Sequence, residues 1–266
     1  MYFLSEGMND FPGLFVLQSV VEQYGRGEGM LTIRQFSKSY KGGKKAVHNL
    51  SLTVEKGDIY GFIGHNGAGK TTTIRAVVGV LDFEEGEIEI DGISMKKDPL
   101  ACKSRIAYIP DNPDLYDHLT GIQYLGFIGD LFNVSRKDRE LLIAKYGGAF
   151  QLTPHLGDLI SGYSHGMKQK LAIISALIHK PKLLVLDEPF VGLDPKAAHT
   201  LKTIMAEVCS EGSAIFFSTH VLDTAEKLCN KIAIIKEGRL IAGGKTEDVK
   251  GENSLEEVFM ELIDHD

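Results

Sequence analysis

The residues from Gly64 to Thr71 read Gly-His-Asn-Gly-Ala-Gly-Lys-Thr, which is the spacing of a phosphate-binding loop. In such a loop, glycines let backbone N–H groups curl around phosphates, Lys70 supplies positive charge, and the Thr71 hydroxyl can bind Mg²⁺. The loop follows a strand-like run, Ile59 to Ile63, and opens a helical stretch, Thr71 to Val80, as the motif requires. A glycine-rich turn with a solvated lysine is the alternative. We predict nucleotide binding by Gly64, His65, Asn66, Gly67, Ala68, Gly69, Lys70, Thr71 and Thr72.

A second motif places two carboxylates, Asp187 and Glu188, directly after the apolar run Leu183 to Leu186. A phosphate-binding loop requires an acidic residue at the end of a buried strand to complete a magnesium site. We predict that Asp187 is the magnesium partner and that Glu188 is the general base that polarises the attacking water. An exposed acidic turn is the alternative. The two motifs together favour nucleotide hydrolysis over binding alone.

Between these motifs lies Tyr163-Ser164-His165-Gly166-Met167-Lys168-Gln169-Lys170. From about Leu31 to Lys245 the chain resembles the ATPase subunits of ABC transporters, and this segment resembles a variant of the family's Leu-Ser-Gly-Gly-Gln signature. Only Ser164 and Gly166 match the signature strictly. The resemblance implies that the Ser164 hydroxyl and the Gly166 N–H meet a γ-phosphate at a helix N-terminus. Without the family, the segment is a capped amphipathic helix.

Further matches follow in the family's order. Gly192-Leu193-Asp194 resembles the D-loop, and His220, after the apolar strand Ala214 to Phe217, resembles the switch histidine that contacts the γ-phosphate. Tyr40 stands where the family often stacks an aromatic ring on adenine, although a tyrosine at a strand end is often only packed. The resemblance therefore adds His220 and Tyr40 to the P-loop side of the site.

One position departs from the family. Where its members commonly carry a glutamine that reaches Mg²⁺, this chain has Pro110-Asp111. Asp111 retains an oxygen ligand but adds a negative charge and shortens the reach. Asp111 either coordinates the metal or only shapes the loop. The predicted metal ligands are thus Thr71, Asp187 and Asp111.

The alternation of strand-like and helical segments predicts an α/β fold. With the resemblance, we expect a P-loop NTPase core with a mixed sheet, an antiparallel β subdomain, and an inserted helical subdomain at about 112–178. The expected division is an N-terminal extension (1–29), an ABC-type ATPase domain (31–245), and a C-terminal helical tail (246–266). The extension lacks Lys or Arg ahead of its apolar stretch, which is the wrong charge for a secretory signal. We interpret it as a vector remnant or an upstream start.

Composition sets the remaining limits. The 266 residues hold 36 acidic and 29 basic side chains, a net charge of −7, and 43% are hydrophobic, which is typical of a soluble globular protein. This balance makes nucleic acid an unexpected partner, and no apolar run approaches the ~20 residues of a membrane span. Three widely spaced cysteines predict reduced, partly buried thiols.

The resemblance also implies partners. ATP is the expected substrate, with Mg²⁺, held between two head-to-tail subunits of a homodimer or heterodimer, in which Ser164, Gly166 and Asp194 act in trans. Separate transmembrane permease subunits would receive the work of hydrolysis at the cytoplasmic face of the cell membrane, for export more than import. The alternatives are a soluble ABC-type ATPase with a non-transport role and a binding-only regulator without ATPase activity.

Overall fold

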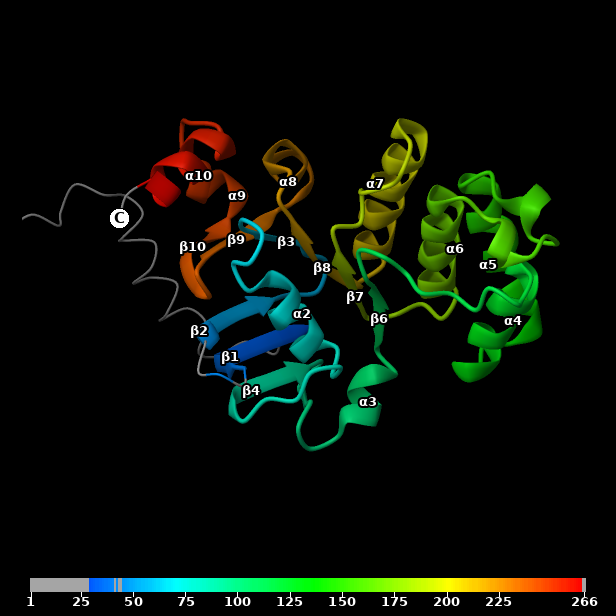
Figure 1. Ribbon diagram of the computed structural model, residues 1–266, viewed down its shortest axis with the longest axis horizontal. Coiled ribbons are helices and arrows are strands. Elements are labelled where there is room, and N and C mark those ends of the chain that lie inside the picture. Colours follow the sequence, from blue (N-terminus) through cyan, green and yellow to red (C-terminus); the bar gives the residue numbers. More distant parts are fainter. Residues whose placement is uncertain (1–28, 41, 43–44, 265–266) are drawn as a thin grey trace, which may run out of the picture.

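The computed structural model describes residues 29–264 except 41, 43 and 44 (Figure 1). The strands are β1 (Leu31–Ser39), β2 (Lys45–Val54), β3 (Ile59–Ile63), β4 (Glu85–Ile90), β5 (Ile93–Ser94), β6 (Ile106–Ile109), β7 (Leu183–Asp187), β8 (Ala214–Thr219), β9 (Lys231–Lys236) and β10 (Arg239–Lys245). The helices are α2 (Lys70–Val77), α3 (Pro99–Lys103), α4 (Gly121–Leu131), α5 (Arg136–Ala149), α6 (His165–Leu177), α7 (Pro195–Ser210), α8 (Leu222–Leu228), α9 (Thr246–Lys250) and α10 (Leu255–Asp264), with 3₁₀ turns at Thr153–His155 and Ile160–Gly162. The predicted extension lies, apart from Gly29, outside the described residues.

The strands form two sheets. A four-stranded sheet has the order β2-β1-β4-β5 and is antiparallel throughout. A six-stranded sheet has the order β10-β9-β3-β8-β7-β6, with parallel pairs except for the antiparallel β9 and β10. The predicted α/β fold with a mixed sheet and an antiparallel β subdomain is therefore confirmed.

The central strands are apolar because both faces of the six-stranded sheet are covered. Alternate side chains of one strand enter different hydrophobic clusters. On β7, Leu184 and Leu186 join the cluster shared with α6 and α7, whereas Leu183 and Val185 join the cluster shared with the antiparallel sheet and α2. This double burial fixes the carboxyl end of β7, where the predicted acidic pair lies.

The helical insertion forms the end of the molecule farthest from the antiparallel sheet (Figure 1). Helix α4 begins with a capping box between Thr120 and Gln123, and α5 begins with Ser135, whose Oγ accepts the Asp138 N–H at 3.1 Å. Both N-caps agree with the sequence pattern. The capped helix α6 then returns the chain to the core.

Helix α2 differs from its predicted bounds of Thr71 to Val80. It begins at Lys70, since Gly69 before it has a φ of +108°. It ends at Val77, and Gly79 with a φ of +67° turns the chain away. Helix α10 begins with a capping box, because Ser254 N donates to Glu257 and Glu257 N donates to Ser254 Oγ at 3.2 Å.

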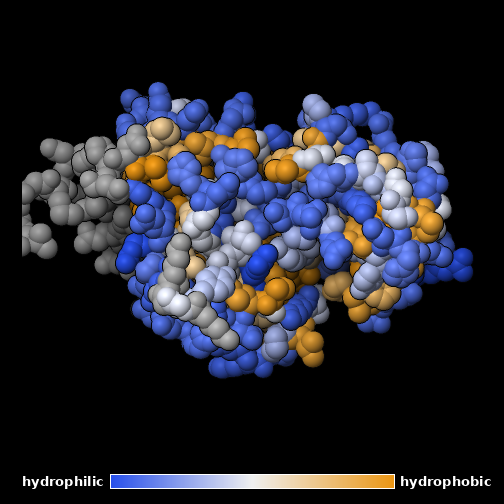
Figure 2. All heavy atoms as spheres, viewed as in Figure 1, coloured by the Kyte–Doolittle hydropathy of each residue, from blue (hydrophilic) through white to orange (hydrophobic). Residues whose placement is uncertain are grey.

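Two further sequence expectations concern burial and length. Cys102, Cys209 and Cys229 are free, as predicted, but they are fully buried and not partly buried. Among the helices in the described part of the chain, none combines the length and apolar character that crossing a membrane requires. Figure 2 shows mainly hydrophilic residues on one face, with hydrophobic residues gathered beside α2 and α3 and toward the helical end.

Candidate functional site

The loop between β3 and α2 has a backbone that only glycines fit. Gly67 and Gly69 have φ values of +83° and +108°, which L side chains rarely adopt. A Cβ at Gly64 would lie 2.5 Å from the Ile235 carbonyl oxygen, and one at Gly69 would lie 2.7 Å from that of Ala46. No side chain caps α2, so the first N–H groups of the helix are available to an anion.

Lys70 lies inside this loop with only 6% of its surface exposed. Its Nζ donates to the carbonyl oxygens of Gly64 at 2.6 Å and His65 at 3.2 Å, and lies 3.9 Å from Glu188 Oε1. Burial lowers the pKa of Lys70, and the nearby carboxylates of Glu188 and Asp187 oppose that shift. The ammonium group is thus positioned at the loop, next to both predicted acidic residues.

The acidic pair is held by a residue that the sequence analysis did not single out. Ser218 faces Asp187 in the register of β7 and β8, and its hydroxyl donates to the Asp187 carboxylate. The Glu188 N–H donates to Ser218 as well, to its Oγ and to its carbonyl oxygen, each at 3.2 Å. Ser218 precedes His220 by two residues, but its role depends on a strand pairing that the sequence does not show.

Glu188 contacts the predicted switch histidine. His220 Nδ1 lies 2.9 Å from Glu188 Oε1, and the histidine side chain is 53% exposed whereas that of Glu188 is 16% exposed. Glu188 has a φ of +48°, a strained value for a glutamate. This backbone aims the carboxylate at His220 and Lys70, so the predicted base, switch and phosphate-binding lysine form one group.

A cavity of about 220 Å³ lies in front of this group. Asp111, one of the predicted metal ligands, lines the cavity from the loop after β6. Ala46 of β2 lines it as well, although the sequence analysis did not single out this residue. The lining residues are Ala46, His65, Asn66, Gly67, Gly69, Lys70, Thr71, Thr72, Asp111, Asp187 and Glu188.

The donor set in this cavity fits Mg²⁺. Within the described ranges, no three His, Cys, Asp or Glu side chains gather as a metal cage. Mg²⁺ in nucleotide sites needs no such cage, because one or two protein oxygens plus phosphate oxygens and water suffice. The buried Asp187 carboxylate and the Thr71 hydroxyl would supply those oxygens, and Asp111, which also lines the cavity, would supply a second carboxylate.

Tyr40 lies beside the same site. Its hydroxyl is 3.2 Å from Thr72 Oγ1 in the first turn of α2, and 45% of the residue is exposed. An exposed ring next to a phosphate loop is available for stacking on a base. The predicted adenine contact thus has the placement it requires, and it stays a prediction.

The predicted signature and D-loop residues meet one another but do not line the cavity. Ser164 caps α6 by accepting the Met167 N–H at 3.3 Å. Asp194 caps α7 by accepting the Ala197 N–H at 2.8 Å, and its other carboxylate oxygen lies 2.8 Å from Lys170 Nζ on α6. This bond to Lys170 lowers the pKa of Asp194. A Cβ at Gly166 would lie 3.0 Å from the Gly192 carbonyl oxygen, so the two segments pack closely.

Comparison with known proteins agrees with this geometry. The ABC transporter family model matches residues 47–191. The chain is 35% identical over 225 residues to the ABC-type transporter ATP-binding protein EcsA of Bacillus subtilis, covering 83% of this chain and 91% of EcsA. It is 33% identical over 241 residues to the ABC transporter ATP-binding protein NatA of the same species, covering 88% and 98%. A solved structure of an ATP-binding subunit of an ABC transporter superposes with a TM-score of 0.85 at 33% identity, covering 88% of this chain and 99% of that one.

Proposed function

This chain belongs to the family of ABC transporter ATP-binding subunits, and from that membership we propose that it hydrolyses ATP to drive transport through separate transmembrane permease subunits. The observation that carries the hydrolysis proposal is the group formed by Lys70, Glu188 and His220 at the edge of the P-loop cavity. Binding alone would need Lys70 and the loop amides but not a glutamate held against a histidine.

In the proposed reaction, the loop N–H groups and Lys70 bind the β- and γ-phosphates. Glu188 accepts a proton from a water molecule as the oxygen of that water attacks the γ-phosphorus. The bond from that phosphorus to the bridging oxygen then breaks, and ADP and phosphate leave. His220 orients the Glu188 carboxylate through their 2.9 Å contact and senses the γ-phosphate. Mg²⁺, held by Asp187 and Thr71 with Asp111 at the edge, would neutralise phosphate charge.

The proposal includes a dimer in which Ser164, Gly166 and Asp194 of one subunit complete the site of the other. Ser164 and Asp194 are exposed and Gly166 is half-buried, and none of the three lines the cavity of its own chain, which supports a role in trans. ATP would hold the two subunits together, and loss of the γ-phosphate would let them separate. The partner is either a second copy or a related ATPase subunit.

We propose that the permease subunits dock on the helical part and that the protein works at the cytoplasmic face of the membrane. Tyr116, Ile122 and Phe127 are each at least 44% exposed, and the Tyr116 ring lies 5.7 Å from that of Phe127. Exposed apolar side chains that lie together, as Tyr116 and Phe127 do, are typical of an interaction surface. We also propose residues 31–245 as the ATPase domain, 112–178 as its helical subdomain, and 246–266 as a helical tail.

The direction of transport is proposed as export, because the Tyr-Ser-His-Gly-Met signature and the closing helix resemble those of bacterial export systems. The test is affinity purification of the tagged chain from detergent-solubilised membranes of its native cell, with ATPase assays on the product. We expect co-purification of an integral membrane protein and activity that the Lys70→Ala variant lacks. Recovery with soluble partners alone would favour the soluble ABC-type ATPase with a non-transport role.

A further inference from the structure

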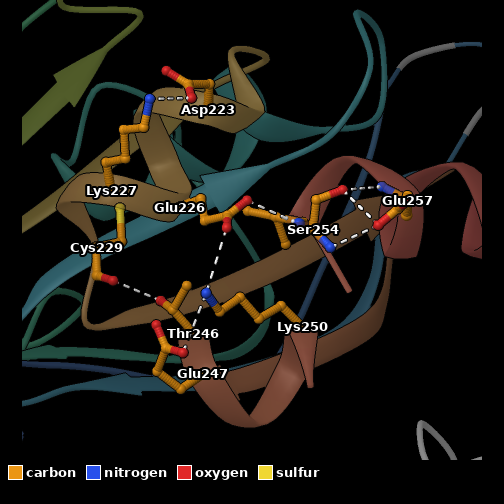
Figure 3. A network of polar contacts seen from close by, with 10 residues as sticks. Asp223, Glu226, Lys227, Cys229, Thr246, Glu247, Lys250, Ser254 and Glu257 are labelled. Atoms are coloured by element: carbon orange, nitrogen blue, oxygen red, sulfur yellow. Dashed lines mark hydrogen bonds and ion pairs between the residues drawn. The ribbon is translucent and has the colours of Figure 1, made fainter. Parts of the chain in front are cut away.

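The C-terminal helix α10 is fixed to α8, the helix that follows His220 (Figure 3). Glu226 of α8 accepts the Leu255 N–H at 2.9 Å, and its other carboxylate oxygen lies 3.4 Å from Lys250 Nζ. Ser254 and Glu257 complete the start of α10 with their capping box. These contacts give the helix a defined position on the ATPase core.

From this anchor, α10 extends to the phosphate-binding loop. Phe259 is 5% exposed, and its ring centroid lies 5.0 Å from that of His65 with an interplanar angle of 62°. At the other end of the helix, Lys236 Nζ donates to the Ile263 carbonyl oxygen at 2.8 Å. A second cavity, of about 240 Å³, lies among Ile263, the end of β9 and the loop residues 65–68. One face of α10 is therefore directed at the loop.

The contact reaches Lys70 through the backbone of His65. The His65 carbonyl oxygen accepts the Lys70 ammonium at 3.2 Å and the Ala68 N–H at 3.1 Å. The side chain of His65 thus contacts α10 while its carbonyl contacts the phosphate-binding lysine. A shift of this residue moves both.

The rest of the loop is already held by the core. Gly64 packs on the Ile235 carbonyl oxygen, and the Ala68 carbonyl oxygen accepts the Gly238 N–H at 2.8 Å. The arch between them, residues 65–67, is exposed, and His65 has the largest side chain in it, beside Asn66 and Gly67. The Phe259 ring contacts His65, and therefore the part of the loop that the core does not hold.

We propose that Phe259 is a positioning residue for the nucleotide site, acting through His65 to hold the arch in the conformation that receives phosphate. The inference rests on ATP binding at this loop. An aromatic pair contributes enough to change affinity by roughly two- to tenfold. A purely structural Phe259 would instead change the stability of the fold without acting through His65.

The test is a double-mutant cycle on the full chain, with mant-ATP and Mg²⁺ as the probe. We expect Phe259→Ala to weaken mant-ATP binding roughly three- to tenfold and to raise the KM for ATP similarly, with kcat changed by less than about twofold. In a His65→Ala background, adding Phe259→Ala should leave the mant-ATP affinity unchanged, because the partner ring is already gone.

Two variants keep the test interpretable. Met260→Ala changes the exposed neighbour on α10 and should bind mant-ATP as the wild type does. Phe259→Leu retains apolar volume but loses the ring, so it replaces Phe259→Ala if that variant fails to fold. Equal weakening in both His65 backgrounds, or no weakening in either, overturns the proposal. A wild-type chain that does not bind mant-ATP contradicts the proposed function itself.

Discussion

The P-loop side and the signature side of this molecule hold their polar residues in different ways. On the P-loop side, Lys70 and Asp187 are buried, and Glu188 contacts both Lys70 and His220 around one cavity. On the signature side, Ser164 and Asp194 are exposed and cap helices of their own chain. One side has the groups for chemistry in place, whereas the other presents helix N-termini outward. This difference is what the proposed dimer requires, because in that dimer the P-loop side of one subunit and the signature side of the other form one site.

The largest effect is expected on the P-loop side, where we propose that hydrolysis takes place. Glu188→Gln should lower kcat for ATP hydrolysis by roughly 10²- to 10⁴-fold, because an amide cannot accept the proton of the attacking water. ATP binding should persist, since Lys70 and the loop amides are unchanged, and the ATP-bound chain should accumulate as a dimer. Steady-state ATPase assays and size-exclusion chromatography with ATP measure both effects. A monomeric and fully active Glu188→Gln variant would remove the assignment of Glu188 and the dimer together.

The next effect tests whether the signature side acts at all. Ser164→Ala removes a hydroxyl proposed to meet the γ-phosphate of the partner, so hydrolysis should fall roughly ten- to hundredfold. Binding of mant-ATP to the isolated chain should stay unchanged, because Ser164 does not line the cavity of its own chain.

The chain offers a matched control for this variant. Ser135 caps α5 as Ser164 caps α6, so both alanine variants should lose about 1 kcal/mol of stability. Only Ser164→Ala should lose ATPase activity. If the two variants lose activity equally, the effect of Ser164 is one of helix stability and its role in trans is refuted.

The distance along the chain between two partners decided which contacts could be predicted from the sequence. The caps at Thr120, Ser135 and Ser254 were predictable because their partners lie three residues away. The phosphate loop was predictable because its glycines and its lysine lie within one short stretch, Gly64 to Lys70. The contact of Ser218 with Asp187 was not, because it spans 31 residues and depends on how β7 and β8 pair.

The sequence did not predict two other features, for the same reason: the strained backbone at Glu188 and the placement of α10 against His65. Each depends on elements that the chain brings together only after folding. The sequence also predicted strands but not their order in the sheet. Strand β3, for example, lies between β8 and β9, which are more than 150 residues away along the chain. Local hydrogen bonding was therefore predictable, and long-range register was not.

A third prediction concerns acid stability of the signature side. His179, after the end of α6, stacks on Phe132 with ring centroids 3.8 Å apart, and burial lowers its pKa to about 4. In the folded state His179 therefore stays neutral down to about pH 4, whereas in the unfolded state it is protonated near pH 6.5. Stability is full above pH 6.5 and falls as the pH drops toward 4, by about 2 kcal/mol between pH 7.5 and pH 5.

Urea unfolding at pH 7.5 and pH 5 measures this loss. His179→Phe keeps a ring on Phe132 but cannot be protonated, so its stability should decline less than that of the wild type by about 2 kcal/mol. His155→Phe is the control, because that histidine is exposed and lies near Asp158 on the surface. If the free energy of unfolding falls by the same amount in the wild type and in His179→Phe, the protonation of His179 does not cause the loss of stability in acid.

The smallest effect is expected at Asp111, on the loop that joins the two sides. Asp111 lines the cavity together with Asp187 and Glu188, so Asp111→Gln removes one negative charge near the proposed phosphate site. If Asp111 contributes to metal binding, the Mg²⁺ concentration for half-maximal ATPase activity should rise about threefold, because a neutral amide binds Mg²⁺ less strongly than a carboxylate does. Asp114→Asn removes a charge from the same loop without touching the cavity and should leave that concentration unchanged. Unchanged magnesium dependence and unchanged activity in Asp111→Gln would exclude Asp111 from the mechanism and leave it a role in shaping the loop.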